Sequence, residues 1–415
     1  MEHETIPKEK TEKELTPLYT RSIINSFGTG MVTPFTGAYA VKLGATASDM
    51  GWFQSSSNIS NNIMQIFWGR LSDKLKRRIP FIVFGSLIVA VLWLPMILVT
   101  NATQLIIILA IQALLGSMAT PAWTALIGDL TPSLKLGRIN ATINLWTSIG
   151  SLIATAISGV IMIKIGVQPH EIFFIPLMVA AICGIASSII MLRIKEKKNH
   201  EKLNLKGQLT RDIFDIITYA RKTPDFLRYC YVEGTFQFFM SIAWPLMSIT
   251  QIKVLNASML DIAMLTIAQS LVTIIFQGWA GRLADRIGRK PCLLFFRFSL
   301  LTVPVAYAFS PNINTLILIS TFWGLSNALG QASMTAYLLD IAPQEYRGSF
   351  AAIFNLIIGI TTFFGSLIGG YLSDYTIGIF GLVLGLQIVY MISLAGRTIG
   401  AVFYLTLKET LKRSA

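Results

Sequence analysis

The sequence has few charged residues, cysteines and histidines for a chain of its length. Charged side chains make up 13% of the 415 residues, while hydrophobic residues make up 53% and the mean hydropathy is +0.62. This composition excludes an ordinary soluble globular protein, in which about a quarter of the residues are charged. It is typical of a chain that lies mostly within a lipid bilayer.

The scarcity of cysteine and histidine argues against metal and thiol chemistry. Cys183, Cys230 and Cys292 are far apart and have no metal-binding or redox spacing. The three histidines fall in predicted loops or in the N-terminal tail. An enzyme embedded in the membrane would need a nucleophile, a metal or an acid–base cluster, and the sequence offers no such cluster built on His or Cys. We therefore predict no enzymatic activity, no metal and no cofactor.

Long apolar runs occupy most of the chain. A membrane-spanning helix needs about 20 apolar residues, and the sequence predicts an all-α membrane protein with twelve such helices. They cover approximately residues 17–42, 50–70, 79–100, 103–128, 137–165, 171–193, 225–250, 257–281, 290–310, 312–340, 348–373 and 383–407.

The net charge of +13 follows the predicted loops rather than forming a nucleic-acid surface. Almost all Lys and Arg fall in alternate loops, and the opposite loops carry only Lys42, Lys164 and Lys253. Basic residues favour cytoplasmic loops, so we expect a multi-pass protein of the cell membrane with both termini in the cytoplasm. Membrane lipid is an expected partner, and nucleic acid is not.

One charged motif occurs twice. Residues 69–78 read GRLSDKLKRR and residues 281–290 read GRLADRIGRK, 212 positions later. A second pair, Asp129 and Asp340, repeats at an offset of 211. The repeats predict a cytoplasmic tail, a six-helix bundle, a cytoplasmic linker, a second six-helix bundle and another tail. These segments span residues 1–16, 17–194, 195–222, 223–407 and 408–415.

The repeated motif resembles the signature between helices 2 and 3 of the major facilitator superfamily. The second copy matches every position, and the first departs at Lys76, where the signature has Gly. The resemblance implies two six-helix pseudo-repeats that transport solutes by alternating access. It also implies a gating latch that holds the cytoplasmic side closed, formed by Gly69, Asp73, Arg77, Gly281, Asp285, Arg289, Asp129 and Asp340.

Each latch residue type has a physical role in this prediction. Glycine lets backbones pack closely, and an aspartate can cap the N-terminus of a neighbouring helix. The arginines would pair with these aspartates or with those at the ends of helices 4 and 10. The alternative is that the basic residues only set the topology.

In the family, helices 1, 4, 7 and 10 line the substrate cavity. The resemblance places there Asn25, Phe27, Thr33, Gln112, Trp123, Gln237, Trp244, Trp323, Asn327 and Gln331. Amides and aromatic rings with little fixed charge suit a neutral or amphipathic solute. The alternative for each residue is packing between helices. For the polar face of helix 2, which includes Asn58, hydrogen bonds between helices are favoured over substrate contact.

Charged residues inside the membrane are candidates for proton coupling. Glu233 lies at a depth similar to that of Arg397 and Arg297. A pair with either arginine would make Glu233 structural, whereas an unpaired Glu233 facing the cavity could carry a proton. Because helix 7 lines the cavity in the family, the second role is favoured.

The sequence therefore predicts a monomeric secondary transporter that exports small amphipathic compounds, coupled to protons. An uptake carrier for a metabolite or sugar, or a sensor on the same fold, are the alternatives. Two family features are absent. Gln112 to Gly116 lacks the arginine common in proton-coupled exporters, and residues 191–196 lack the motif of sugar porters.

Overall fold

The computed structural model describes residues 8–75, 77–131, 136–165, 168–194, 222–343 and 346–411. These residues form helices and turns, with no strand among them. The predicted linker lies outside the described residues except at Lys222.

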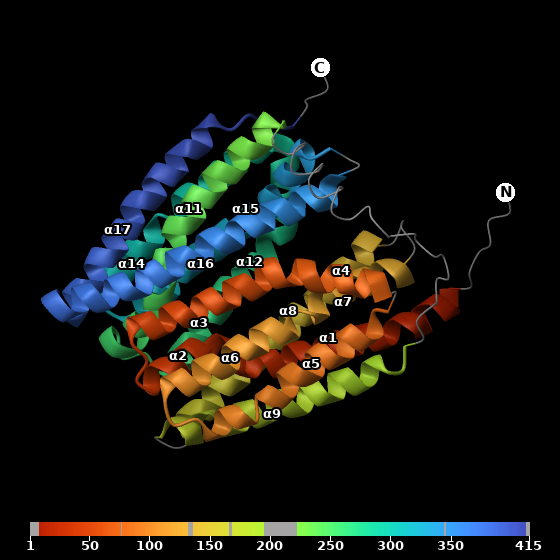
Figure 1. Ribbon diagram of the computed structural model, residues 1–415, viewed down its shortest axis with the longest axis horizontal. Helices are drawn as coiled ribbons and strands as arrows, with labels where there is room; N and C mark the ends of the chain where they lie inside the picture. The colour runs from red at the N-terminus through yellow and green to blue at the C-terminus, as the bar shows by residue number, and fades with distance from the viewer. Residues whose placement is uncertain are drawn as a thin grey trace.

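The N-terminal half makes six passes along the long axis of the molecule (Figure 1). Breaks within the first four passes divide them into shorter helices. The elements are α1 (Lys8–Val32), η1 (Thr33–Phe35) and α2 (Thr36–Lys42); α3 (Ala47–Ile59), the π-helical turn η2 (Ser60–Met64) and α4 (Gln65–Leu75); α5 (Ile79–Leu92) and η3 (Pro95–Leu98); α6 (Ala102–Gly116) and α7 (Ala119–Leu130); α8 (Leu136–Lys164); and α9 (Pro169–Met191).

The C-terminal half repeats this arrangement. Its elements are α11 (Pro224–Ile249) with the π-helical turn η5 (Thr250–Val254); α12 (Met259–Ile287); α13 (Arg289–Ser299) and α14 (Thr302–Phe309); α15 (Ile313–Ile341); α16 (Arg347–Phe380); and α17 (Leu382–Phe403) with η7 (Tyr404–Thr406).

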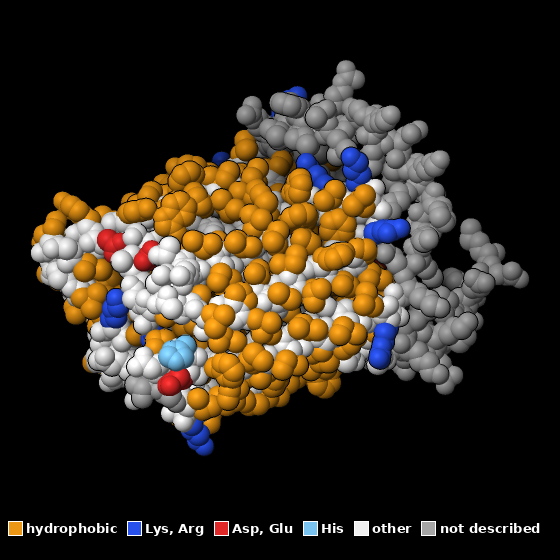
Figure 2. All heavy atoms as spheres, turned by 60° about the horizontal axis from the view of Figure 1, so that its bottom comes forward, with side chains coloured by type: hydrophobic (Ala, Val, Ile, Leu, Met, Phe, Trp, Pro, Cys, Tyr) orange, Lys and Arg blue, Asp and Glu red, His pale blue; other side chains and the backbone are white. Residues whose placement is uncertain are grey.

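Nine helical segments of the described chain are long and apolar enough to cross a membrane. The other three passes begin at α1, α3 and α11, where polar residues such as Asn58 and Gln237 lower the hydropathy. An apolar belt covers the visible face, with the charged side chains near its two ends (Figure 2). The predicted all-α, twelve-pass fold in two six-helix halves is confirmed.

The first helix begins earlier than expected. Residues 1–16 were predicted to be a solvated tail, but α1 is already helical from Lys8. The segment after Lys8 alternates Lys and Glu, both of which are good helix formers. The helix therefore extends beyond the apolar span that begins near Pro17.

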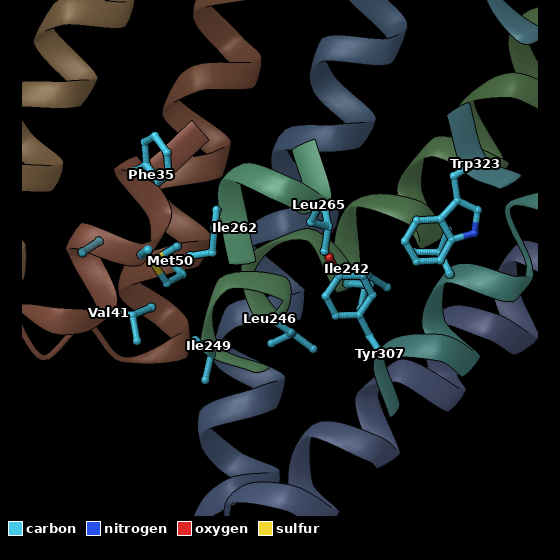
Figure 3. Packing of buried hydrophobic residues seen from close by; sticks show 14 of the residues in the cluster. Phe35, Val41, Met50, Ile242, Leu246, Ile249, Ile262, Leu265, Tyr307 and Trp323 are labelled. Carbon is cyan, nitrogen blue, oxygen red and sulfur yellow. The ribbon is translucent and has the colours of Figure 1, made fainter. Parts of the chain in front are cut away.

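One hydrophobic cluster extends through both halves and joins them at the end of the molecule farthest from the start of α1. Phe35, Val41 and Met50 of the first half belong to the same buried cluster as Ile249 and Ile262 of the second (Figure 3). The ribbons of the halves diverge from this end toward the end where α1 begins (Figure 1). We call these the closed end and the terminal end.

Candidate functional site: the interface between the halves

A carboxylate joins the two halves at the closed end. Asp374 of α16 accepts hydrogen bonds from the backbone N–H groups of Ala47 and Ser48, both at 2.9 Å. These donors are the first two residues of α3, and a helix N-terminus carries partial positive charge that favours a carboxylate. Asp374 therefore caps a helix of the opposite half.

Polar side chains of α3 continue this contact along α16. Ser55 Oγ donates to the carbonyl oxygen of Phe363 at 2.8 Å. Asn58 Nδ2 lies 3.4 Å from both the carbonyl oxygen of Thr362 and Ser366 Oγ. For Asn58, the predicted role in hydrogen bonding between helices is what the structure shows.

Glycines mark where the halves touch and where they do not. A Cβ added at Gly51 would lie 2.9 Å from the backbone of Ser366, and one at Gly359 would lie 2.7 Å from Asn62 Cβ. Added Cβ atoms at Gly278, Gly281 or Gly348, toward the terminal end, would meet nothing within 4 Å. The described residues of the two halves are therefore in contact at the closed end and apart at the terminal end.

This arrangement corrects the role predicted for the two motif glycines. Gly281 lies inside α12 with open space beside it, and a Cβ at Gly69 would contact only Pro121 of the same half, at 3.3 Å. Neither glycine ends a helix. Gly69 therefore packs closely against α7, as predicted, whereas the close packing predicted for Gly281 is not present.

The predicted cavity residues divide into packed and accessible groups. Gln112 is buried and donates to the carbonyl oxygen of Val89 at 3.0 Å. Trp323 is buried too; its Nε1 donates to Thr302 Oγ1 at 2.9 Å, and its ring stacks on Tyr307 (Figure 3). Both side chains are occupied within their own half, so the structure does not place them in a substrate cavity.

The remaining candidates are more accessible. Thr33 and Gln331 are exposed, and the others are half-buried: Asn25, Phe27, Trp123, Gln237, Trp244 and Asn327. Asn25 accepts a hydrogen bond from Ser187 at 3.4 Å. Along α15 the side chains pass from buried Trp323 to exposed Gln331, toward the terminal end.

Glu233 forms a buried ion pair inside the C-terminal half. Its Oε1 accepts a short hydrogen bond from Arg297 Nη2, and its Oε2 accepts one from the Tyr404 hydroxyl. The side chains of Glu233 and Arg297 are 0% and 1% exposed. The favoured prediction of an unpaired Glu233 facing the cavity is therefore wrong for this conformation, because helix 7 turns this residue toward α13 and η7.

Arg397 is not the partner of Glu233. Its guanidinium donates to Ser393 Oγ and to the carbonyl oxygens of Leu300 and Met240, at 3.0–3.1 Å. It joins α17 to α11 and to the end of α13. Of the two arginines predicted at this depth, only Arg297 reaches the carboxylate.

The half-buried side-chain amide of Gln237 connects the ion pair of Glu233 and Arg297 to a less buried part of α11. Gln237 Nε2 donates to Glu233 Oε1 at 2.8 Å, and Gln237 lies one turn along the helix. The other amide atom, Gln237 Oε1, is buried without a hydrogen-bond partner. No described residue donates to this oxygen, so an unused hydrogen-bond acceptor lies beside the ion pair.

Residues predicted to form the latch make ion pairs within each half. In the C-terminal half, Arg289 lies 2.5 Å from Asp285 and 3.5 Å from Asp340. In the N-terminal half, the arginine that reaches Asp129, at 3.5 Å, is Arg78. Arg77, which was predicted for this role, is exposed, and the side chain of Asp73 is outside the described set.

The C-terminal tail supplies a helix cap that the sequence did not reveal. Glu409 accepts hydrogen bonds from the backbone N–H groups of Arg289 and Lys290, at 2.9 and 3.0 Å, and of Thr410 and Leu411, both at 2.9 Å. Partial burial raises the pKa of Glu409, but these four donors outweigh it and lower that pKa below its ordinary value. The cap predicted for Asp285 is supplied by Glu409 instead.

A buried arginine in the N-terminal half was also missed. Arg21 of α1 is 7% exposed; its guanidinium carbon lies 4.1 Å from the centre of the Trp123 ring, and its Nη2 donates to Ser86 Oγ at 3.2 Å. The sequence contained a signal for it, because Arg21 precedes Glu233 by the 212-residue offset of the repeat. Arg21 was counted among the basic residues of the N-terminal tail, so it was not considered as a buried residue.

Comparisons with known proteins agree with this architecture. The sequence profile described as Major Facilitator Superfamily matches residues 19–239 and 232–414. An uncharacterized MFS-type transporter of Methanocaldococcus jannaschii is 23% identical over 360 residues, which is 85% of this chain and 86% of that protein. The crystal structure of a mutant of the nucleoside transporter NupG has a TM-score of 0.77 at 14% identity, covering 95% of this chain and 99% of that one.

A shorter match involves the quinolone resistance protein NorA of Staphylococcus aureus. It is 29% identical over 136 residues, which is 32% of this chain and 35% of that protein. The profile matches, by contrast, extend over nearly the whole chain, once for each half. The chain is a multi-pass membrane protein that belongs to the Major Facilitator Superfamily of secondary transporters.

Proposed function

We propose that this transporter exports small amphipathic organic compounds across the cell membrane in exchange for protons. The observation that carries the proposal is the buried carboxylate of Glu233, which is paired with Arg297 in this conformation and is also hydrogen-bonded to half-buried Gln237 on α11. We infer that Glu233 binds a proton when the pair with Arg297 opens during transport. An ionisable group inside a membrane protein marks a candidate proton pathway. The local similarity to a quinolone resistance protein supports export as the direction.

Proton binding at Glu233 would change its bond to Arg297. The ionised carboxylate holds the guanidinium in a charge-assisted hydrogen bond. A proton on Glu233 neutralises the carboxylate and leaves the charge of Arg297 without its counter-ion, which is costly inside a low-dielectric bundle. The two protonation states therefore favour different side-chain arrangements, and a solute that prefers one of them couples its binding to the proton.

The predicted topology is part of the proposal. Segments 1–16, 195–222 and 408–415 would lie in the cytoplasm, so the terminal end would face inward. A cysteine placed near Asn101 or Asn312, which cap α6 and α15 at the closed end, should react with an impermeant maleimide in intact cells. A cysteine near Asn204 should not. Labelling at Asn204 in sealed cells would reverse the orientation.

The coupling proposal is tested by flux in proteoliposomes. A fluorescent aromatic solute is followed with and without a pH gradient, for the natural chain and for Glu233→Gln. The variant should lose accumulation driven by the gradient but keep solute exchange. Glu171→Gln, which neutralises an exposed carboxylate in the first turn of α9, serves as the matched control.

Two results would contradict the proposal. If Glu233→Gln still concentrates the solute against its gradient, Glu233 does not carry the coupling proton. If the variant unfolds and Arg297→Met restores folding without coupled flux, the pair is structural. Net flux directed inward would favour an uptake carrier, and counterflow of labelled solute separates any carrier from a sensor.

A further inference from the structure

The buried arginine of the N-terminal half occupies the position that holds the carboxylate in the C-terminal half. Arg21 precedes Glu233 by 212 residues, and Ser86 precedes Arg297 by 211. Trp123 precedes Met334, whose sulfur lies 3.1 Å from Arg297 Nη2, by the same 211. Three contacting residues in one half thus correspond to three contacting residues in the other.

The two clusters differ in charge. In the C-terminal half the carboxylate and the guanidinium neutralise each other. In the N-terminal half serine replaces the arginine, arginine replaces the glutamate, and no carboxylate of the described residues forms an ion pair with Arg21. Its Nε is buried without a hydrogen-bond partner. A guanidinium buried without an anion is costly in a membrane bundle, so this cluster lacks one negative charge among the described residues.

Aromatic and hydroxyl groups surround the uncompensated charge. The indole of Trp123 packs on the guanidinium, and Trp123 is itself half-buried on α7. On the same helix Thr120, Thr124 and Gly128 are exposed. A flat aromatic solute could therefore reach Trp123 from the exposed side of α7, and an acidic group on it could reach Arg21 once the indole shifts.

We propose that Arg21, Ser86 and Trp123 form a binding site for the carboxylate of an aromatic organic acid. Arginine presents several donors in a planar fork that matches a carboxylate, the Ser86 hydroxyl adds a donor, and Trp123 stacks on the aromatic body. The inference refines the substrate class and so rests on the proposed role as a carrier of organic solutes. Its test measures binding alone, so it can fail while coupled flux survives.

The experiment compares an acid with its neutral analogue on the purified full-length protein. Binding of 2-naphthoate and 2-naphthamide is followed by tryptophan fluorescence and by the thermal midpoint Tm. We expect the acid to bind about tenfold more tightly, the size of one charge-assisted hydrogen bond in a buried site. Arg21→Gln should abolish this preference, and Arg21→Lys should retain only part of it.

A second arginine variant serves as the control. Arg228→Gln removes an exposed positive charge in the other half and should leave the preference unchanged. Equal affinity for acid and amide in the natural chain, or a full preference in Arg21→Gln, would overturn the proposal. Chloride that stabilises the natural chain but not the variant, without naphthoate binding, would overturn it too, by showing a site for small inorganic anions. If Arg21→Gln does not fold, an unreduced preference in Arg21→Lys gives the same refutation.

Discussion

The two halves share one backbone plan but satisfy their buried polar groups differently. The C-terminal half encloses a matched pair, Glu233 and Arg297, whereas the N-terminal half encloses Arg21 beside Ser86. The same contrast appears where the third and ninth passes begin. Helix α5 starts at Ile79 and has Pro80, which has no N–H to satisfy, as its second residue, while α13 starts with N–H groups capped by Glu409. The two halves thus keep corresponding positions and contacts, but the side chains at these positions differ in charge and hydrogen bonding.

The largest expected effect is in the matched pair. Arg297→Met strands the Glu233 carboxylate in the core, which should cost about 3–5 kcal/mol of stability. The double variant Glu233→Gln/Arg297→Met should recover most of this loss. Thermal unfolding in detergent measures both. A double variant as unstable as Arg297→Met would mean that the charge of Glu233 is not the cause.

The equivalent change in the N-terminal half should cost far less. Arg21→Met strands no buried acid. It removes one hydrogen bond and one cation–π contact but also a costly buried charge, so the free energy of unfolding should fall by no more than about 1 kcal/mol. The same unfolding assay gives the comparison directly. A loss as large as that of Arg297→Met would reveal a counter-ion for Arg21 and remove the contrast between the halves.

Among the predicted latch residues, the effect on stability should be smaller and should differ between the neighbouring Arg77 and Arg78. Arg78→Gln removes the contact to Asp129 and should weaken the terminal end of the N-terminal half by about 0.5–1 kcal/mol. Arg77→Gln should have no effect, because Arg77 is exposed. Hydrogen-exchange rates of amides near the end of α7 compare the two variants. Arg289→Gln, in α13, is the corresponding variant of the C-terminal half. Equal effects at Arg77 and Arg78 would contradict the observation that Arg78 is the arginine that pairs with Asp129.

The smallest expected effect is the pH dependence of the α13 cap. The lowered pKa of Glu409 means that its stabilisation is complete above the ordinary glutamate value of 4.5 and is lost as pH falls through the lowered value. Exchange at Arg289 and Lys290 should therefore accelerate below pH 4.5. In Glu409→Gln it should be fast throughout, whereas α5 should show no such step. A step that persists in the variant would assign the titration to another group.

The helices were predictable because apolar runs and repeat offsets are local in sequence. The passes, the two halves and the Asp129–Asp340 correspondence followed from them. The shift from Arg77 to Arg78 had a signal too: the offset falls from 212 at Gly69 to 211 at Asp129, so one extra residue lies between them. By contrast, the choice of Arg297 over Arg397 depends on helix rotation, and the Glu409 cap depends on how the tail folds back. Neither is encoded by spacing.

The capping of α3 by Asp374 makes the two seams between the halves mechanically unequal. The seam of α3 and α16 is held by directional hydrogen bonds, which Asp374 accepts and which Ser55 and Asn58 donate. At the opposite seam Gly159 of α8 packs closely against Ala263 of α12, since a Cβ added at Gly159 would lie 2.7 Å from Ala263 Cβ. We therefore expect the closed end to open by separation of α3 from α16, while α8 and α12 stay in contact and the halves rotate about them.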